Sequence, residues 1–429
     1  MSLKDRLTRL TGDAPKPLSI DDRLAELRRK LDRAMLPREH NTQAGIPSSR
    51  RGKTPLEHVV AGEEARTPHG AFFLSRATMK ADDMHGRVRI CDAACASMEA
   101  AADLAGIRME RNVSMEGGLF LDTETTGLSG GTGTFPFLIG LGWFEAGSFV
   151  TCQLFARDFS EEGAMLTYLS ELASGRQFLV TFNGRAYDLN LLAARFILNR
   201  CPDTLSPMPH VDLLHPSRRI LAHRLEKARL STIEIEVLGV ERDGDVPGFE
   251  IPGRYFDWLR YRDGNALGDV FKHNRLDIVS LASLLKYLTD LVEDSHDMAH
   301  SHHGDLLKLA GVILERGDRG KAGRMFEALT LSHQADVATS ARQALSLIYK
   351  KARRWEEAAA VWKELVASNP RDFFAVVELA KFYEHHAREH GKARELVARL
   401  LDEAAGLSRD ERASAEHRLH RLLRKASPE

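Results

Sequence analysis

The chain has 429 residues, more than one compact hydrophobic core accommodates, so we expect about two or three domains. Its 60 basic and 61 acidic residues give a formal net charge of -1, which argues against a globally basic nucleic-acid binder but allows a local basic groove. No apolar run approaches the roughly 20 residues of a membrane helix. The first residues, MSLKDRLTRLTGDAPKP, lack a signal-peptide core. We therefore expect a cytoplasmic protein that does not enter a membrane.

The N-terminal region, residues 1–56, is predicted to be a helix followed by a flexible linker. Apolar residues recur at helical spacing over 18–35, and Pro, Gly, Ser and basic residues dominate 36–56. Farther on, HGAFFLSRATM at 69–79 predicts an edge strand or hairpin. The Ala-rich segment 92–106 predicts a helix.

Strand and helix patterns alternate from about 117 to 290, which predicts an α/β domain over 57–293. The expected strands are 118–125, two strands within 135–156 joined by a turn at Glu145-Ala146-Gly147, and the apolar run FLVTF at 178–182. The expected helices are 161–173, 187–200, most of 211–240, and 267–293.

Residues 304–429 are predicted to be entirely helical and weakly repetitive, after a polar break at 294–303. The segments GKAGRMF (320–326), EEAAAVW (356–362) and GKARELV (391–397) align, and each places an Ala one turn before a bulky apolar residue. Such spacing, close to a period of about 34, predicts tetratricopeptide-like helix pairs, with an irregular helical bundle as the alternative. We expect this region to bind a protein partner or to extend a nucleic-acid surface.

Two acids interrupt an apolar strand in LFLDTETTGL at 119–128. Alternate strand residues share a face, so Asp122 and Glu124 point the same way. Two such carboxylates repel each other, and burial adds a desolvation penalty. Compensation must come from Arg or Lys partners, from shared protons, or from bound divalent cations.

Two later segments supply further acids next to apolar runs. Asp188 begins the helix of FNGRAYDLNLL, and His273 and Asp277 in FKHNRLDIVSL share one helix face. Carboxylate oxygens are ligands that Mg²⁺ and Mn²⁺ prefer, and two such ions can hold the attacking and leaving oxygens of phosphoryl transfer. The four acids thus predict a site for two Mg²⁺ or Mn²⁺ ions.

The motifs LDTETTGL, FNGRAYDLNLL and HNRLD, in this order, resemble those of the DEDD (DnaQ-like) 3′–5′ exonucleases, which have the ribonuclease-H-like fold. Four longer strings resemble the narrower group of YprB-like proteins, often fused to tetratricopeptide repeats: GGTGTFPFLIGLGWFE, HVDLLHPSRR, LSTIEIEVLGVER and VPGFEIPGRYFDWLR. The resemblance covers roughly residues 60–290. It implies a mixed sheet flanked by helices, followed by an all-α region.

The resemblance also implies roles for single residues. The four acids would ligate metal, with Glu124 also orienting the attacking water, and His273 would be a general base although its H-x3-D spacing matches the family's Tyr subtype. Asp212 in HVDLL is interpreted as a structural acid that braces the fold. Residues beside the acids would contact a polyanionic substrate: Thr125, Gly127, Leu128, Asn183, Arg185 and Arg275.

The sequence therefore predicts a metal-dependent nuclease that hydrolyses phosphodiester bonds, most simply from the 3′ end of DNA or RNA, by water activated at the metal. The direction of digestion rests on the resemblance. Two rival hypotheses stay open. One is a structure-specific endonuclease on the same fold. The other is a scaffold protein that acts through its helical repeats and carries an inactive nuclease core.

Overall fold

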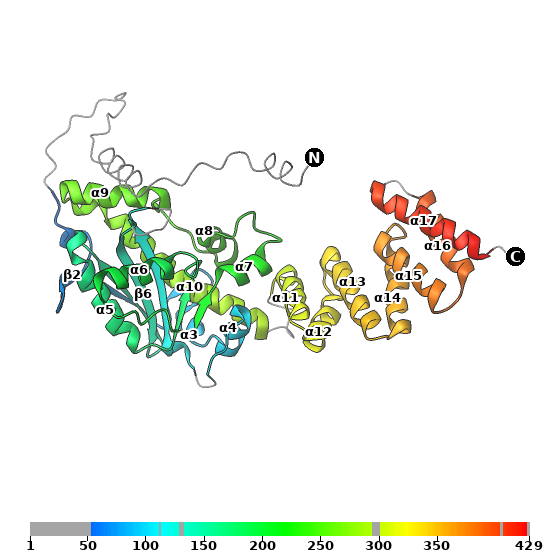
Figure 1. Ribbon diagram of the computed structural model, residues 1–429, viewed down its shortest axis with the longest axis horizontal. Coiled ribbons are helices and arrows are strands. Elements are labelled where there is room, and N and C mark those ends of the chain that lie inside the picture. The colour runs from blue at the N-terminus through cyan, green and yellow to red at the C-terminus, as the bar shows by residue number, and fades with distance from the viewer. Residues whose placement is uncertain (1–52, 111–112, 128–132, 294–300, 404–405, 427–429) are drawn as a thin grey trace, which may run out of the picture.

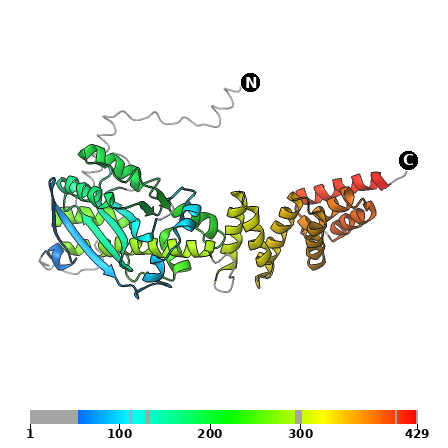
Figure 2. The ribbon, with the colours of Figure 1, turned by 90° about the horizontal axis from the view of Figure 1, so that it is seen from below.

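The computed structural model describes residues 53–110, 113–127, 133–293, 301–403 and 406–426. The predicted N-terminal helix and most of its linker lie outside these described residues. An α/β part extends to Glu293, and a row of helices follows it (Figures 1 and 2). The predicted fold class, a mixed sheet flanked by helices and followed by an all-helical region, is confirmed.

The sheet has seven strands in the order β1-β2-β7-β6-β5-β8-β9. Strand β5, an inner strand of this sheet, pairs with antiparallel β6 on one side and with parallel β8 on the other. A small two-stranded sheet, β3 and β4, stands apart. The strands are β1 Glu63–Thr67, β2 Gly70–Met79, β3 Met84–His85, β4 Val88–Arg89, β5 Gly118–Thr125, β6 Pro136–Glu145, β7 Ser148–Phe155, β8 Phe178–Thr181 and β9 His210–Asp212.

The two hairpins of the sheet follow from their turn residues. Between β6 and β7, Ala146 and Gly147 have φ angles of 49° and 76°, and two successive positive φ values give the tight turn whose twist matches antiparallel strands. The predicted turn at this place is confirmed. Segment 69–79 forms β2, which pairs with β1 as a hairpin.

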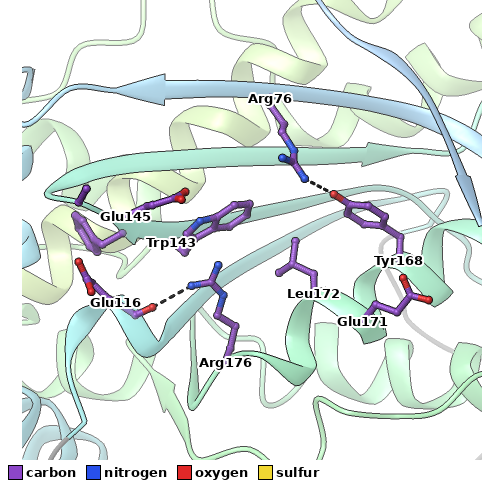
Figure 3. A pocket seen from close by; sticks show the side chains of 10 residues that line it. Arg76, Glu116, Trp143, Glu145, Tyr168, Glu171, Leu172 and Arg176 are labelled. Atoms are coloured by element: carbon purple, nitrogen blue, oxygen red, sulfur yellow. Dashed lines mark hydrogen bonds between the residues drawn. The ribbon is translucent and has the colours of Figure 1, made fainter.

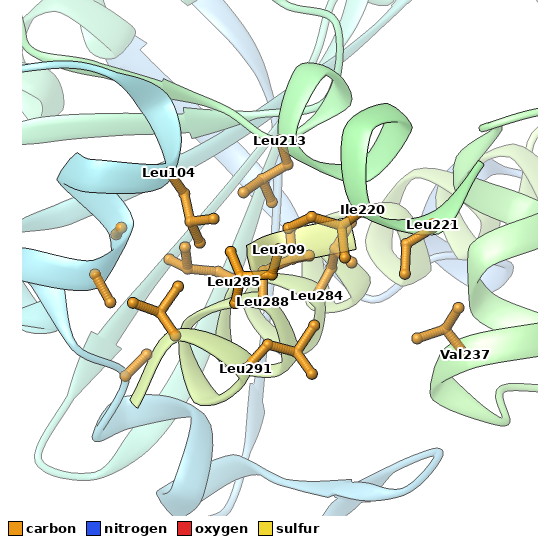
Figure 4. Close-up of a cluster of buried hydrophobic side chains, with 14 of the residues drawn as sticks. Leu104, Leu213, Ile220, Leu221, Val237, Leu284, Leu285, Leu288, Leu291 and Leu309 are labelled. Carbon is orange, nitrogen blue, oxygen red and sulfur yellow. The ribbon is translucent and has the colours of Figure 1, made fainter. Parts of the chain in front are cut away.

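Both faces of β5 are covered by helices. Phe120 packs in a core that includes α4 and α10, whereas Leu119 and Leu121 pack in a second core that includes α5 and α6. Figure 4 shows the first core continuing along Leu284, Leu285 and Leu288 of α10. The helices are α3 Ile90–Ala94, α4 Met98–Ala105, α5 Glu162–Ser174, α6 Asp188–Asn199, α7 Leu214–Leu221, α8 Leu230–Ile233, α9 Ile251–Tyr261 and α10 Gly268–Glu293.

Two predicted helical segments differ from the structure. The segment 92–106 is two helices, because Ser97 accepts a hydrogen bond from the N–H of Ala100 and so caps a new helix at Met98. The prediction that 211–240 is helical is wrong at its start, where β9 pairs in parallel with β8. A three-residue strand buried on all sides has too short a pattern to distinguish it from a helix.

The helices after Glu293 pack on one another in sequence. Each of the three predicted Ala-to-bulky pairs is buried, on α12, α14 and α16 respectively: Ala322 with Phe326, Ala358 with Trp362, and Ala393 with Val397. Ser408 and Glu411 form a capping box before the last helix. These helices are α11 His303–Glu315, α12 Arg319–Leu329, α13 Ala335–Lys351, α14 Trp355–Ser368, α15 Phe373–His385, α16 His390–Asp402 and α17 Arg409–Ala426.

The first of these helices share a hydrophobic core with the α/β part. Leu306 and Leu309 of α11 and Phe326 of α12 belong to the cluster that contains Phe120 of β5. Among the residues that the structure describes, no helix combines the length and apolar character needed to cross a membrane.

Two buried histidines make the fold sensitive to acid. Burial lowers the pKa of His85 to about 4 and that of His210 to about 4, from an ordinary 6.5. His85 contacts the Ser280 hydroxyl at 2.7 Å, and His210 contacts the Thr181 hydroxyl at 2.8 Å. Both rings are neutral in the folded protein at pH values where the unfolded chain protonates them. Their contribution to stability is therefore present above pH 6.5 and is lost as the pH falls toward 4.

We expect the free energy of unfolding to fall more steeply with acid in the wild type than in the H85Q/H210Q variant. The difference between the two proteins should change by up to about 4 kcal/mol between about pH 6.5 and about pH 5, because each ring contributes at most about 1.4 kcal/mol per pH unit. Urea unfolding at several pH values measures it. Parallel pH profiles would contradict the prediction.

Candidate metal centre

The end of β5 holds Asp122 and Glu124 where the sheet opens on one side. The parallel pairing of β5 with β8 stops at Phe120, two residues before Asp122, while the pairing with β6 continues. A register irregularity between Glu124 and Thr125 then ends the regular ladder. Both acids share the face of Phe120, which is the face that α10 covers. The strand thus fixes the backbone of the acids and leaves space beside them.

Asp188 comes to this place from α6. It is the first residue of the helix, it is 6% exposed, and it accepts a hydrogen bond of 2.5 Å from the Thr123 hydroxyl of β5. Asp212 fixes the loop before α6, because its carboxylate accepts the backbone N–H groups of Asn183 and Arg185 at 2.8 and 3.0 Å. The interpretation of Asp212 as a structural acid agrees with these bonds.

Helix α10 supplies the remaining predicted residues. Asp277 and His273 lie four residues apart on it, and His273 Nε2 is 3.6 Å from Asp277 and 4.0 Å from Glu124. Asn274 donates from its amide nitrogen to Asp122 at 2.9 Å. Single oxygens of Glu124 and Asp277 and one ring nitrogen of His273 all lie within 4.8 Å of one another. The structure therefore brings together the five residues predicted as catalytic.

The charge of this cluster is costly. Burial, reinforced by repulsion from Asp277 and Asp188, raises the pKa of Asp122 well above its ordinary value. Burial, together with repulsion from Asp122 and Asp277, does the same to the pKa of Glu124. Burial also raises the pKa of Asp188 to about 6. These carboxyl groups are poorly stabilised as anions by the protein alone, which is the condition that a bound cation relieves.

One acid of the cluster has its charge neutralised by an arginine. Arg242, in the loop after the π-helical turn η4 (Glu234–Leu238), pairs with Asp277. Within the described residues, no Lys or Arg side chain forms an ion pair with Asp122, Glu124 or Asp188. Their oxygen donors fit Mg²⁺ or Mn²⁺, which are bound through one or more carboxylates together with waters and substrate phosphate.

A cavity of about 270 Å³ adjoins the acids. Its lining includes Glu124 and Thr125 of β5, Tyr187 just before α6, Gly248 just before α9, and Pro252 in the first turn of α9. The Tyr187 hydroxyl donates to the carbonyl of Gly127 at 2.6 Å, and Thr125 lies 3.0 Å from the same hydroxyl. Of the predicted substrate-binding residues, Thr125 thus lines the cavity and Gly127 lies beside it.

The other predicted substrate-binding residues lie in different surroundings. Arg185 and Asn183 are exposed in the loop before α6. The structure does not bring Arg275 to the acids: its guanidinium contacts Gln153 at 3.2 Å and Ser75 at 3.4 Å. Arg275 lies two residues before Asp277, which places it about 160° away around the helix. Leu128 is outside the described residues.

A larger cavity of about 620 Å³ is lined by side chains from β2, β6 and α5, among them Arg76, Trp143 and Tyr168 (Figure 3). Arg176 lies over the Trp143 ring at 4.8 Å, and Arg76 donates to the Tyr168 hydroxyl. Trp143 follows the β6 residues that pair with Asp122 and Phe120, so this cavity lies farther along β6, away from the acids. None of the predicted catalytic residues lines it.

Sequence reasoning missed four residues that shape the acid cluster. Arg242 pairs with Asp277, and Glu234 and Asp245 hold Arg242. Asn274 contacts Asp122 and in turn accepts a hydrogen bond of 2.9 Å from Gln153. The motif HNRLD contains Asn274, and helical spacing places it on a side of α10 different from that of Arg275. Nothing in the local sequence around Arg242 points to Asp277.

Gly140 of β6 gives a test of the Asn274 contact. A Cβ atom at Gly140 would lie 2.3 Å from Asn274 Oδ1, so Gly140→Ala forces the amide away from Asp122. We expect the affinity for Mn²⁺ to fall about ten- to a hundredfold, the usual effect of losing a group that orients a metal ligand. Titration calorimetry measures it.

Gly142→Ala is the matched control, because its Cβ would meet Ile278 and Phe149 at 2.5 Å on the same strand without touching the acids. Both variants overpack the interior and should lose about 1–3 kcal/mol of stability. Only Gly140→Ala should bind Mn²⁺ more weakly. An equal loss of affinity in both variants would contradict the role of Asn274.

Comparisons with known proteins agree with this architecture. Residues 119–289 match the model of the RNase H superfamily. The chain is also 36% identical over 315 residues to "Uncharacterized protein YprB" of Bacillus subtilis (strain 168), an alignment that spans 72% of this chain and 75% of the relative. The matched segment contains the strand, both helices and all four acids described above. The chain therefore belongs to the family of this Bacillus subtilis protein, and its residues 119–289 match the RNase H superfamily.

Proposed function

We propose that the protein is a divalent-metal-dependent nuclease that hydrolyses phosphodiester bonds of DNA or RNA from the 3′ end. The observation that carries the proposal is the meeting of four acids from β5, α6 and α10, three of which have no Lys or Arg partner among the described residues. The RNase H superfamily supports nucleic acid as the substrate. The 3′-to-5′ direction rests on the resemblance of the motifs to DEDD exonucleases.

Asp122, Glu124 and Asp188 would hold the cation. A divalent ion there would offset the charge of the carboxylates and act as a Lewis acid toward the scissile phosphate. Without a bound cation, the negative carboxylates would repel the phosphate groups of a substrate. Since all three are backed by buried hydrogen bonds or strand pairing, they would present their oxygens without rearrangement.

His273 would accept the proton of the attacking water. Its Nδ1 lies 2.8 Å from the carboxylate of Asp245, so this nitrogen carries the ring proton. Nε2 therefore presents a lone pair, and it faces the side chains of Glu124 and Asp277. Histidine at H-x3-D spacing is thus geometrically suited to a general base, because one helical turn puts it beside the last acid.

The cavity beside Glu124 would hold the terminal nucleotide. Its lining combines the Tyr187 ring, Pro252 and the hydroxyl of Thr125, a mixture suited to a base and a sugar. The exposed Arg185 would meet a phosphate farther along the strand. We further propose that α11–α16 are tetratricopeptide-like pairs that bind a protein partner, which the three buried Ala-to-bulky pairs support.

The test is digestion of end-labelled linear DNA and RNA, with covalently closed circles of the same sequence as controls, in Mg²⁺ or Mn²⁺. We expect mononucleotides to be released from the 3′ end and circles to remain intact. Cleavage of circles would favour the endonuclease hypothesis. Absence of cleavage of any substrate in either metal would favour the scaffold hypothesis.

A further inference from the structure

We propose that the guanidinium of Arg242 takes the place of a second divalent cation beside Asp277, so that the centre holds one divalent ion. This inference rests on the proposed function and differs from the two-ion site that the sequence predicts. The single ion would bind through Asp122, Glu124 and Asp188, the acids without an arginine partner.

The position of Arg242 is fixed by three carboxylates. Its Nη2 atom donates both to Asp277 and to Glu234, and Nη1 donates to Asp245 at 3.1 Å. The side chain is only 8% exposed. One oxygen of Asp277 is thus engaged by the guanidinium, and the other lies 3.6 Å from His273 Nε2. The charge of Asp277 is therefore already neutralised by the guanidinium before any metal ion binds.

Arg242 cannot easily leave when metal arrives. Glu234 is fully buried on the π-helical turn, and Arg242 is its sole Lys or Arg partner among the described residues. Besides Arg242, Glu234 accepts a hydrogen bond from the Ser280 hydroxyl of α10. Withdrawal of the guanidinium would strand a buried carboxylate, and a buried charge without its partner is strongly unfavourable.

The guanidinium also repels a second ion by its own charge. At the distance of direct contact with Asp277, its positive charge neutralises the acid that a second cation would need. Arginine and divalent cations can serve the same purpose at a phosphoryl group, which is to stabilise the negative charge that develops there. Arg242 therefore supplies a permanent positive charge, while Asp122, Glu124 and Asp188 bind the exchangeable divalent ion.

The number of bound Mn²⁺ ions tests the inference without an activity assay. Titration calorimetry of the full chain at neutral pH should give one ion for the wild type. The E234Q/R242M variant removes the buried Glu charge and its arginine together, which releases Asp277. The number of bound Mn²⁺ ions should therefore rise to two. The E162Q/R195M variant is the control, because it removes another buried pair, Arg195 with Glu162 at 2.5 Å. It should still bind one Mn²⁺ ion.

Asp277→Asn provides a second measurement if E234Q/R242M fails to fold. It should still bind one Mn²⁺ with an affinity within about threefold of wild type, since Asp277 is not a ligand of that ion. Two ions in the wild type, an unchanged value of one in folded E234Q/R242M, or loss of the ion in Asp277→Asn would each overturn the inference while leaving a nuclease in place. No Mn²⁺ binding by the wild type would overturn both the inference and the proposed function.

Discussion

Asp122→Asn should abolish nuclease activity and at the same time stabilise the metal-free protein. Asp122 is one of three carboxylates proposed to hold the cation, and its loss should reduce the rate about a thousandfold or more, equivalent to about 4 kcal/mol of transition-state stabilisation. The fold should survive, because the oxygen of an Asn side chain can still accept the hydrogen bond that Asn274 donates at 2.9 Å.

The gain in stability follows from the direction of the pKa shift. Burial and repulsion from Asp277 and Asp188 raise the pKa of Asp122, so the folded protein binds its proton more tightly than the unfolded chain does. As the pH rises above the ordinary value of 3.8, the unfolded chain loses the proton first and the folded state loses stability. The penalty is complete at a pH above the raised pKa, and Asn at this position removes it.

Asp212→Asn is the matched control, since Asp212 is also a buried acid at the end of a strand of this sheet. Its carboxylate accepts three backbone N–H groups, from Asn183, Arg185 and Leu214. Loss of charged hydrogen bonds there should cost about 1.5–3 kcal/mol. Thermal unfolding in a chelator and at neutral pH compares the variants. Destabilisation by Asp122→Asn, or nuclease activity near that of the wild type, would contradict the proposed metal centre.

The parts of this centre that could be predicted are those with a local pattern. Asp122 and Glu124 interrupt an apolar strand, and strand alternation places both on one face. His273 and Asp277 are one helical turn apart, which is enough to expect them side by side. The order of the motifs along the chain then connected them with Asp188 through the family resemblance.

The parts that could not be predicted depend on residues far apart in the sequence. Arg242 reaches Asp277 across 35 positions, and Asn274 reaches Asp122 across 152. Arg242 lies in a loop, where no periodicity tells which way a side chain points. The sequence therefore predicts four acids at the site but does not show that one of them, Asp277, pairs with Arg242.

The fold shows the same division. Long elements with strong patterns, such as α10 and the β6–β7 hairpin, were predicted almost to their ends. The strand β9 was missed because its three residues belong to the sheet only through pairing with β8. The core shared by α10, α11 and α12 was also not apparent, since a polar segment at 294–303 separates their sequences.

Arg224→Met should be among the most destabilising single substitutions at the contact between the α/β part and α11. Asp305 of α11 is fully buried, and Arg224 binds its two oxygens at 3.0 and 2.6 Å. Tyr287 of α10 donates to the same carboxylate. Removing the arginine leaves a buried charge without its main partner, at a cost of about 3–5 kcal/mol.

Arg219→Met is the matched control, because Arg219 of α7 pairs with Glu315 of α11, and Arg224 follows α7 by three residues and also binds α11. Its side chains are 41% and 72% exposed, and an exposed pair contributes about 0–1 kcal/mol. A double variant, R224M/D305N, should recover most of the stability lost in Arg224→Met, since it removes the buried charge together with its partner. Urea unfolding of the full chain compares the three proteins.

These measurements decide whether α11 is fixed to the α/β part or only linked to it. Leu306 and Leu309 belong to the core that contains Phe120 of β5, so a weakened contact at Asp305 should destabilise both parts in one transition. Equal effects of the two arginines, or separate unfolding of the two parts in the wild type, would show that the buried pair does not couple α11 to the α/β part.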